Sequence, residues 1–197
     1  MYPIVRLLKD ALRASRQPRL GPRDTHVSQH HCWPWDIDIW MELNNGRTLT
    51  LYDIGRTMLT LRTGLAGVLR REGWSVAVAG TSIRYRRRIK AFERFEMKSR
   101  AIGWDERFIY VEQGMWKANG DCANHALLRT VVTDRNGIVA PARVLTAWGQ
   151  DPQSPPLPDW VKAWIAAEDQ RPWPPMEDAA SAQKSDVRLA SASCPLP

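Results

Sequence analysis

The segment at residues 36–47, DIDIWMELNNGR, places several carboxylates immediately before a change of periodicity. Along residues 33–40, alternating residues predict an extended strand, with Asp36 and Asp38 on one face and an apolar opposite face. Over residues 49–65, hydrophobic residues recur at intervals of three and four, which predicts a mostly buried helix. The chain is therefore expected to pass from strand to helix directly after a group of acids.

The start of the predicted helix has the residues needed to bind a developing negative charge. Asn44 or Asn45 can act as the N-cap and accept a hydrogen bond from one of the first N–H groups. The remaining N–H groups carry partial positive charge and can stabilise an oxyanion. With Asp38 or Glu42 nearby, the segment would combine a base or nucleophile with an oxyanion hole, which suits acyl transfer or hydrolysis. Asp36 is interpreted differently, as a solvated acid in a turn.

The spacing of these residues resembles the active-site segment of hotdog-fold acyl-CoA thioesterases of the 4-hydroxybenzoyl-CoA thioesterase type. That segment contains an Asp, three residues, usually a His, one residue, and then Asn-Asn at the start of the central helix. Four residues of this chain match the pattern in register: Asp38, Glu42, Asn44 and Asn45. Two later stretches, residues 80–87 and 101–105, resemble strands of the thioesterase-superfamily-member branch, and the resemblance covers about residues 27–150.

The resemblance implies an α+β hotdog fold, in which an antiparallel β-sheet wraps around a long central helix. It implies that Asp38, assisted by Glu42, activates water or attacks a thioester, while N–H groups at Asn44, Asn45 and Gly46 hold the oxyanion. A coenzyme A thioester is then the substrate and no cofactor is expected. The resemblance also implies a homodimer or homotetramer, with sheets meeting edge to edge and sites at the subunit boundary.

Glu42 departs from the family pattern, because most members have His at this position. A carboxylate cannot donate a proton as a cation does, and it would repel an ionised Asp38 if the two groups came close. The departure supports an alternative function, that of a non-catalytic hotdog protein that binds acyl-CoA or lipid. Dehydration of hydroxyacyl thioesters is a further alternative on this fold, but it usually relies on the absent His.

The charge of the chain suits an anionic partner. The net charge is +7 and the isoelectric point is near 9.7, which would fit a CoA ester, a nucleic acid or an anionic membrane surface. Nucleic acid is the weaker choice, because the sequence contains no zinc-finger spacing, helix-turn-helix turn or aromatic RNA-binding motif.

The densest basic cluster lies at residues 84–90. Strand alternation would place Arg84, Arg86 and Arg88 on one face, where they could bind CoA phosphates, or where they could instead form a solvated edge that discourages aggregation. Trp40 could line an acyl pocket, the alternative being core or dimer packing. Thr50 and Tyr52 are further candidates for lining that pocket.

The second half of the chain predicts an antiparallel meander. Runs rich in β-branched and aromatic residues indicate strands at residues 74–90, 95–102, 107–117, 123–133 and 138–148. Gly, Asn and Asp separate several of these runs and are typical of tight turns. The expected order is therefore strand, long helix and meander.

Composition divides the chain into four regions. Residues 1–26 form a basic segment that could be a short amphipathic helix, either docked or frayed, with membrane contact as the weaker alternative. Residues 27–150 would be the hotdog domain, residues 151–169 a linker and a short helix with Asp159 as its N-cap, and residues 170–197 a disordered tail. No apolar run approaches the ~18 to 20 residues that span a bilayer, and no secretory signal is recognised.

The thiol and imidazole side chains do not predict a separate chemistry. The three cysteines are widely spaced, which argues against a disulfide framework and favours a reducing, cytoplasmic location. Cys32 is interpreted as a small buried hydrophobe and His125 as a hydrogen-bonded structural residue. His26, His30 and His31 lack metal-ligand spacing, so no metal site is expected.

Overall fold

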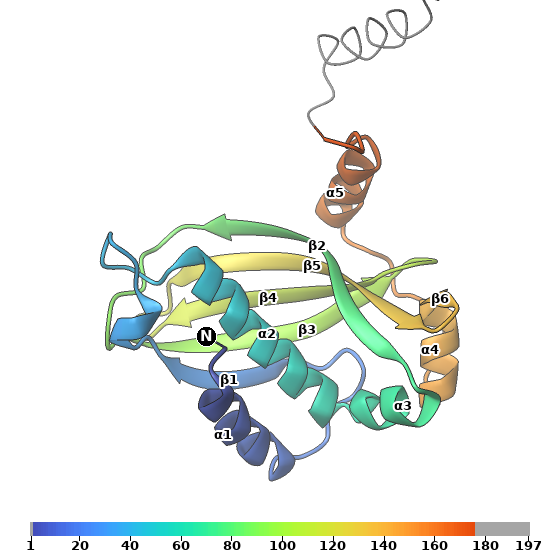
Figure 1. Ribbon diagram of the computed structural model, residues 1–197, viewed down its shortest axis with the longest axis horizontal. Helices are drawn as coiled ribbons and strands as arrows, with labels where there is room; N and C mark the ends of the chain where they lie inside the picture. The colour runs from blue at the N-terminus through green and yellow to red at the C-terminus, as the bar shows by residue number, and fades with distance from the viewer. Residues whose placement is uncertain (1, 176–197) are drawn as a thin grey trace, which may run out of the picture. The chain divides into compact units, whose positions relative to one another are not determined.

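The computed structural model describes residues 2–175 and divides the chain into two units (Figure 1). The first unit ends at Leu157, and the second begins at Pro158. The second unit contains α5 (Asp159–Asp169), the short helix expected after the linker, although Pro158 rather than Asp159 is its N-cap. Most of the tail expected at residues 170–197 lies outside the described residues.

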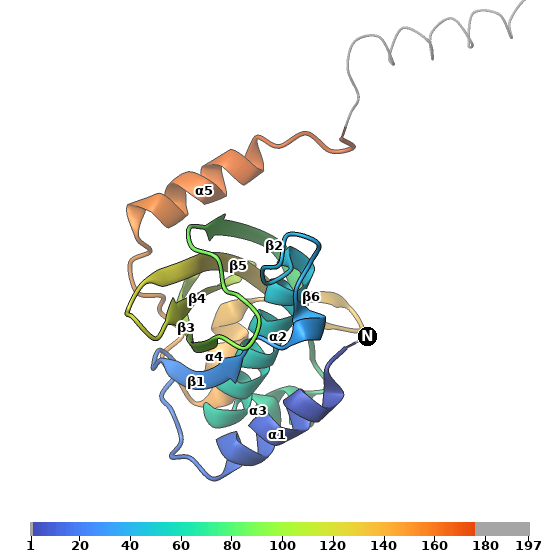
Figure 2. The same ribbon diagram turned by 90° about the vertical axis from the view of Figure 1, so that its left-hand side faces the viewer.

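One antiparallel sheet forms the framework of the first unit. Its strands are β1 (His26–His31), β2 (Ser75–Tyr85), β3 (Arg94–Trp104), β4 (Ile109–Lys117) and β5 (Cys122–Asp134), and their spatial order is β1-β3-β4-β5-β2. The short β6 (Gly137–Val139) pairs with β5. All pairings are antiparallel, and β3, β4 and β5 form the predicted meander. The sheet curls around α2 (Asn45–Arg62), as Figures 1 and 2 show.

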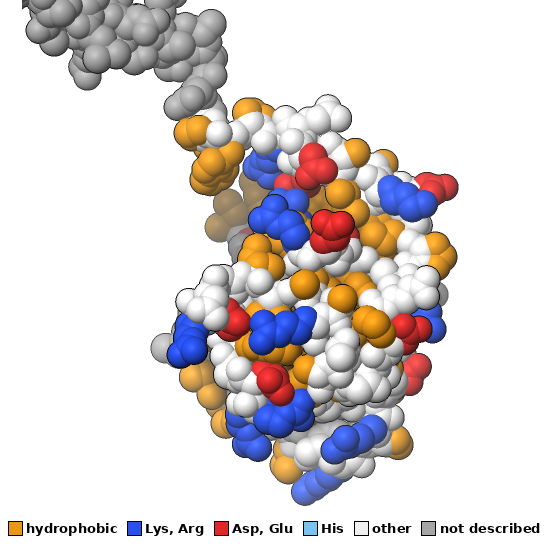
Figure 3. Space-filling view, turned by 90° about the vertical axis from the view of Figure 1, so that its right-hand side faces the viewer, with side chains coloured by type: hydrophobic (Ala, Val, Ile, Leu, Met, Phe, Trp, Pro, Cys, Tyr) orange, Lys and Arg blue, Asp and Glu red, His pale blue; other side chains and the backbone are white. Residues whose placement is uncertain are grey.

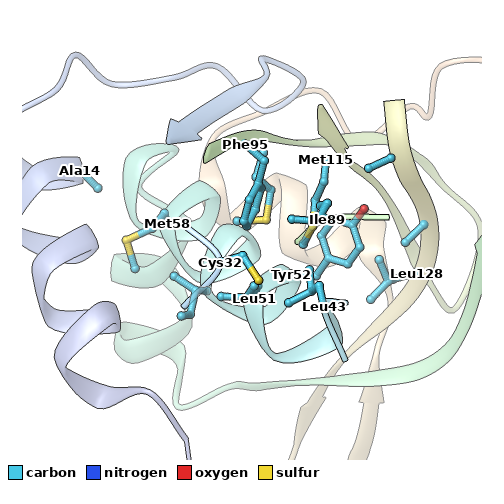
Figure 4. Close-up of a cluster of buried hydrophobic side chains, with 14 residues drawn as sticks. Ala14, Cys32, Leu43, Leu51, Tyr52, Met58, Ile89, Phe95, Met115 and Leu128 are labelled. Carbon is cyan, nitrogen blue, oxygen red and sulfur yellow. The ribbon is translucent and has the colours of Figure 1, made fainter. Parts of the chain in front are cut away.

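The core lies between α2 and the curled sheet. Leu51, Ile54 and Met58 of α2 are at most 1% exposed, and together with Tyr52 they pack against Phe95, Met115 and other buried side chains of the sheet (Figure 4). Each such burial stabilises the fold by roughly 1.5 to 3 kcal/mol relative to exposure. Gly55 permits the close approach, because a Cβ there would lie 2.7 Å from Met97 Cε.

A second apolar cluster lies at the far end of α2. Gly64, with φ of 79°, ends the long helical run and begins α3 (Leu65–Glu72), a separate helix that the sequence pattern did not predict. Trp74, Trp104 and Leu145 belong to this cluster, to which α3, β6 and α4 (Pro141–Trp148) contribute. Figure 3 views the molecule from this side and shows hydrophobic side chains interspersed with charges of both signs.

The prediction of a strand at residues 33–40 is wrong. β1 ends at His31, and the 3₁₀ helix η1 (Pro34–Asp36) follows. The Asp36 carboxylate accepts a hydrogen bond from the Trp33 backbone N–H at 3.0 Å, which closes this turn. The alternation of polar and apolar residues therefore did not produce a strand, because the buried Asp36 carboxylate stabilises a turn instead. Asp36 and Asp38 do not share a strand face.

Two further boundaries differ from the prediction. β2 ends at Tyr85, because the backbone N–H groups of Arg86 and Arg87 both turn to the carbonyl oxygen of Ala123. The strand predicted at residues 138–148 is limited to β6, and Pro141 instead begins α4. Proline is well suited to the first helical position, where its missing N–H and fixed φ cost nothing.

The amphipathic N-terminal helix is confirmed as α1 (Ile4–Ser15). It packs beside α2, and Leu7, Ala11 and Ala14 contact the core cluster. Arg6 and Asp10 also point inward and are 9% and 5% exposed. The inward face of α1 is therefore partly ionic.

Candidate active site

A tight turn presents the two candidate acids just before α2. Ile37 and Leu43 pair as an isolated antiparallel bridge, and the Asp38 backbone N–H donates to the Glu42 carbonyl at 2.9 Å. Met41 has a φ of 59°, a left-handed conformation that few non-glycine residues adopt. The Asp38 carboxylate accepts a hydrogen bond from the Trp40 backbone N–H at 2.9 Å, and this bond stabilises the turn.

The start of α2 carries the expected cap. Asn44 is the N-cap, and its Oδ1 accepts the Arg47 N–H at 3.1 Å. The Asn44 N–H donates to the Asp36 carbonyl at 2.9 Å, which fixes how the chain enters the helix. The N–H groups of Asn45 and Gly46 are in the first turn, where the helix itself offers no acceptor and the dipole is positive.

A cavity of about 180 Å³ lies beside this helix start. Glu42 lines it, together with Asn45 and Thr48 of α2. The other side of the cavity is lined by residues of β2, of the loop after it and of β5, namely Tyr85, Arg86, Arg87, Arg88 and Asn124. The Arg88 Nε lies 2.9 Å from Glu42 Oε2, so this carboxylate faces a cation rather than the Asp38 carboxylate.

Asp36 anchors the segment instead of lying in solvent. It is 1% exposed, with Arg6 Nη2 at 2.7 Å from one carboxylate oxygen and Arg47 Nε at 3.1 Å from the other. The prediction of a solvated turn acid is therefore wrong. Two guanidiniums from α1 and α2 supply the charge that water would otherwise provide, and they lock the turn to both helices.

The structure brings together only some of the predicted site residues. Glu42, Asn45, Arg86 and Arg88 line the 180 Å³ cavity, whereas Asp38 lies in the adjoining turn and does not line it. Asn44, Gly46 and Thr50 line a different cavity of about 400 Å³, which also contacts Tyr2 and Trp35. Arg84 lies within β2, and Trp40 is 71% exposed in the turn. The predicted single strand face for Arg84, Arg86 and Arg88 is wrong, because β2 ends before Arg86.

Three uncharged polar residues of the cavity were missed by the sequence analysis, namely Thr48, Tyr85 and Asn124. Asn124 is 3% exposed and accepts a hydrogen bond from the Tyr52 hydroxyl. Tyr52 itself is buried in the core, and burial raises the pKa of its hydroxyl. Asn124 could have been found from the sequence, because it is an amide within the otherwise apolar run of β5. A buried polar side chain at such a position needs a hydrogen-bond partner, which marks it as a residue with a specific role.

A third cavity, of about 390 Å³, lies beside the C-terminal half of α2. Its lining is mainly apolar and includes Leu59, Leu69, Val76, Ala101, Trp104, Val132, Leu145 and Trp148. Asp53 and Arg56 supply its charged part and form an ion pair of 2.9 Å. The Tyr2 hydroxyl donates to Asp53 at 2.7 Å, and burial together with this bond raises the pKa of Tyr2 to about 12.

The cysteine and histidine interpretations agree with their surroundings. Cys32 is fully buried, and burial raises the pKa of its thiol to about 11, so the nucleophilic thiolate is disfavoured at neutral pH. His125 Nε2 lies 2.9 Å from Glu112 Oε1, as expected for a hydrogen-bonded structural residue. Among residues 2–175, no group of three or more His, Cys, Asp or Glu is arranged to hold a metal ion.

Comparison with known proteins identifies the family. The family described as the Thioesterase-like superfamily matches residues 32–165. The chain belongs to this superfamily. Its relative Protein THEM6 of Xenopus laevis is 31% identical over 139 residues, which cover 69% of this chain and 65% of that protein.

Comparison with solved structures identifies the fold of this superfamily member. The YbaW probable thioesterase from Escherichia coli has a TM-score of 0.55 at 17% identity, covering 58% of this chain and 88% of that one. The DHNA-CoA thioesterase from Staphylococcus aureus has a TM-score of 0.52 at 13% identity, covering 74% and 91%. At such identities the likeness establishes the fold, which is the predicted α+β hotdog fold. None of the helices within residues 2–175 has the length and hydrophobicity that crossing a bilayer requires.

Proposed function

We propose that this superfamily member hydrolyses acyl-CoA thioesters at the start of α2. The observation that carries the proposal is the 180 Å³ cavity, in which Glu42, Asn45 and three successive arginines meet. A carboxylate, helix N-terminal N–H groups and guanidiniums are the groups that thioester hydrolysis on a CoA substrate needs. Membership of the superfamily supports the reaction class.

In the proposed reaction, a carboxylate of the turn activates water. Asp38 is the first choice for this role and Glu42 assists it, in line with the family spacing. The carboxylate removes a proton as the water oxygen attacks the thioester carbon. The N–H groups of Asn45 and Gly46 stabilise the oxyanion, after which the C–S bond breaks and the leaving thiolate takes up a proton. A direct attack by the carboxylate, followed by hydrolysis of the resulting anhydride, is the variant with a nucleophile.

The substrate is proposed to be a CoA ester because of the arginines. Arg86, Arg87 and Arg88 surround the cavity, and guanidiniums bind phosphate oxygens through two parallel hydrogen bonds. Arg84 and the exposed Trp40 would then contact the substrate from outside the cavity. The proposal needs no cofactor, since water is the only other reactant.

A homodimer would complete the proposed site. β2 is an outer strand of the sheet, and nine of its eleven residues are exposed. Pairing with β2 of a second copy would satisfy its open edge, in the edge-to-edge manner of the family. Such pairing would also bring a second chain next to Arg84.

A second candidate function is binding of acyl-CoA without turnover. It is favoured by the 2.9 Å ion pair between Glu42 and Arg88, at a position where the family usually has His. A carboxylate held by a guanidinium is directed toward that cation and away from a water molecule it would have to activate. In this case the cavity would hold the ligand and the thioester would survive.

Release of free thiol from short, long and aromatic acyl-CoAs tests both functions. We expect Asp38→Asn to lower kcat/KM at least about a hundredfold for every substrate, since general-base catalysis typically contributes that much or more. Glu42→Gln should have a smaller effect, and Glu106→Gln, at an exposed acid outside the cavity, should have none. Acyl-CoA that binds but is not hydrolysed by the wild type would favour the binding protein. Full turnover in Asp38→Asn would reject the proposed base.

A further inference from the structure

The helix α1 exposes most of its apolar side chains. Val5 is 83% exposed, Leu8 63%, Ile4 59% and Leu12 55%. In the same helix Arg6 and Asp10 are buried, which reverses the usual distribution of polar and apolar residues. We propose that this exposed stripe, formed by Ile4, Val5, Leu8 and Leu12, binds the surface of an anionic lipid bilayer.

The rotation of α1 about its own axis is fixed from the inside. Arg6 contacts the buried Asp36 carboxylate at 2.7 Å, and Asp10 lies 3.7 Å from the buried His30 ring. Ala14 is also buried, one turn farther along. Turning the stripe inward would pull both charged groups away from these partners, which would leave Asp36 with one cation fewer. The exposure of the stripe is therefore built into the fold.

Basic side chains border the stripe. Successive residues of an α-helix are 100° apart around its axis. On this basis Lys9 and Arg16 lie directly beside the edge of the stripe formed by Val5 and Leu12, and Arg13 lies beyond them. All three are exposed. Apolar side chains beside a row of cations are typical of helices that lie in the bilayer interface, where each Lys or Arg adds about 1 kcal/mol of attraction to anionic lipid.

The charges also favour lipid over a second copy of the chain. An isologous contact through the stripe would bring the two rows of Lys9, Arg13 and Arg16 near one another. Like charges close together at an interface oppose association. An anionic surface pairs with the same cations while it takes up the apolar side chains. In Figures 1 and 2, α1 lies at the periphery of the first unit, as a planar partner requires.

Vesicle co-sedimentation of the full chain tests the proposal. The wild type should sediment with vesicles of phosphatidylcholine and phosphatidylglycerol, and less with phosphatidylcholine alone or at high salt. The double variant Leu8→Ser/Leu12→Ser should lose at least about tenfold in affinity, because burying two leucine side chains in the bilayer contributes more than that factor. The triple variant Lys9→Gln/Arg13→Gln/Arg16→Gln should lose about a hundredfold on the anionic vesicles only.

The control is Ile138→Ser, which removes an exposed apolar side chain from β6 and should bind as the wild type does. Thermal unfolding of each variant shows whether the fold is kept. Failure of the wild type to bind anionic vesicles would overturn the proposal without using any variant. Self-association that disappears in the leucine variant, with no vesicle binding, would show instead that the stripe contacts a second copy.

Discussion

The two ends of α2 have opposite surroundings. At its start, the helix meets the turn with Asp38 and Glu42, and a small cavity lined with arginines. Its C-terminal half borders a cavity of about 390 Å³ with a mainly apolar lining. Leu59 follows Asn45 by 14 residues, which is about 21 Å of helix. The polar and charged groups near the 180 Å³ cavity therefore lie at one end of α2, and the mainly apolar cavity, which suits a hydrocarbon chain, lies at the other.

The two ends are also fixed in different ways. At the start, the buried Asp36 carboxylate lies between Arg6 and Arg47. At the other end, Arg62 lies 3.1 Å from His26 Nδ1 and also donates to the Pro18 carbonyl at 2.9 Å. The start depends on ion pairs between buried charges, whereas the far end uses one cation with neutral acceptors. This difference predicts unequal sensitivity to mutation and to pH.

The largest expected effect is at the start of α2. Asp36→Asn should lower the free energy of unfolding by about 3 to 5 kcal/mol, because two largely buried guanidiniums would lose their anion. Urea unfolding followed by tryptophan fluorescence measures this change. Asp38→Asn is the matched control and should cost less than about 1 kcal/mol, since its carboxylate caps an exposed turn. Equal effects of the two substitutions would show that the ion pairs do not fix this end.

The far end should respond to acid. Burial, with a contribution from Arg62, lowers the pKa of His26 from 6.5 to about 4. Between these values the unfolded chain binds more protons at this site than the folded chain. Its contribution to stability is therefore fully present above pH 6.5 and is lost as the pH falls toward 4, by roughly 3 kcal/mol at most.

His26→Gln keeps an acceptor but removes the titrating group, so the unfolding free energy should fall less steeply between pH 6.5 and 4. Burial lowers the pKa of His30 as well, to about 3, and His30 remains in both proteins, so the difference between them reports on His26 together with its smaller influence on His30. His31→Gln, on the same strand, is the control. Parallel pH profiles for wild type and His26→Gln would contradict the prediction.

The apolar cavity should affect chain-length preference rather than chemistry. Ala101 lines it, and Ala101→Leu would fill part of its volume. If the acyl chain enters this cavity, kcat/KM for long acyl-CoAs should fall about tenfold relative to short ones, the size of effect expected for a changed methylene contact. Ala142→Leu, at an exposed position of α4, should leave the ratio unchanged. An equal loss for all chain lengths would place the acyl chain elsewhere.

The smallest effect is expected at the N-cap. Asn44→Ala removes the acceptor for the Arg47 N–H and should cost about 1 kcal/mol of stability. Because the substitution keeps the Asn44 backbone N–H and both acids of the turn, thiol release should change little. Asn136→Ala provides the comparison, because Asn136 lies in an exposed turn and uses its backbone N–H, not its side chain, to bond Asp134. Thermal unfolding of the two variants measures the difference in stability.

Local patterns in the sequence were enough for most elements. The Asn44 cap and the spacing of the apolar residues predicted where α2 begins, and turn residues such as Gly120 marked the meander. The predictions were wrong where a distant partner changed the local preference. The Arg6 and Arg47 side chains hold Asp36 inside, and the Ala123 carbonyl bends the chain after Tyr85. Contacts of this kind have no signature in a short window of sequence.

For the candidate site, the spacing of Asp38, Glu42 and the two asparagines was sufficient to select the segment and its family. The sequence by itself thus determined the helix, the meander and the family, because each depends on residues close together along the chain. Only the tertiary structure decided that Glu42 faces Arg88, that Asn124 enters the same cavity and that Asp36 is buried. Those outcomes depend on which side chains folding brings together, and that is set by packing of the whole domain.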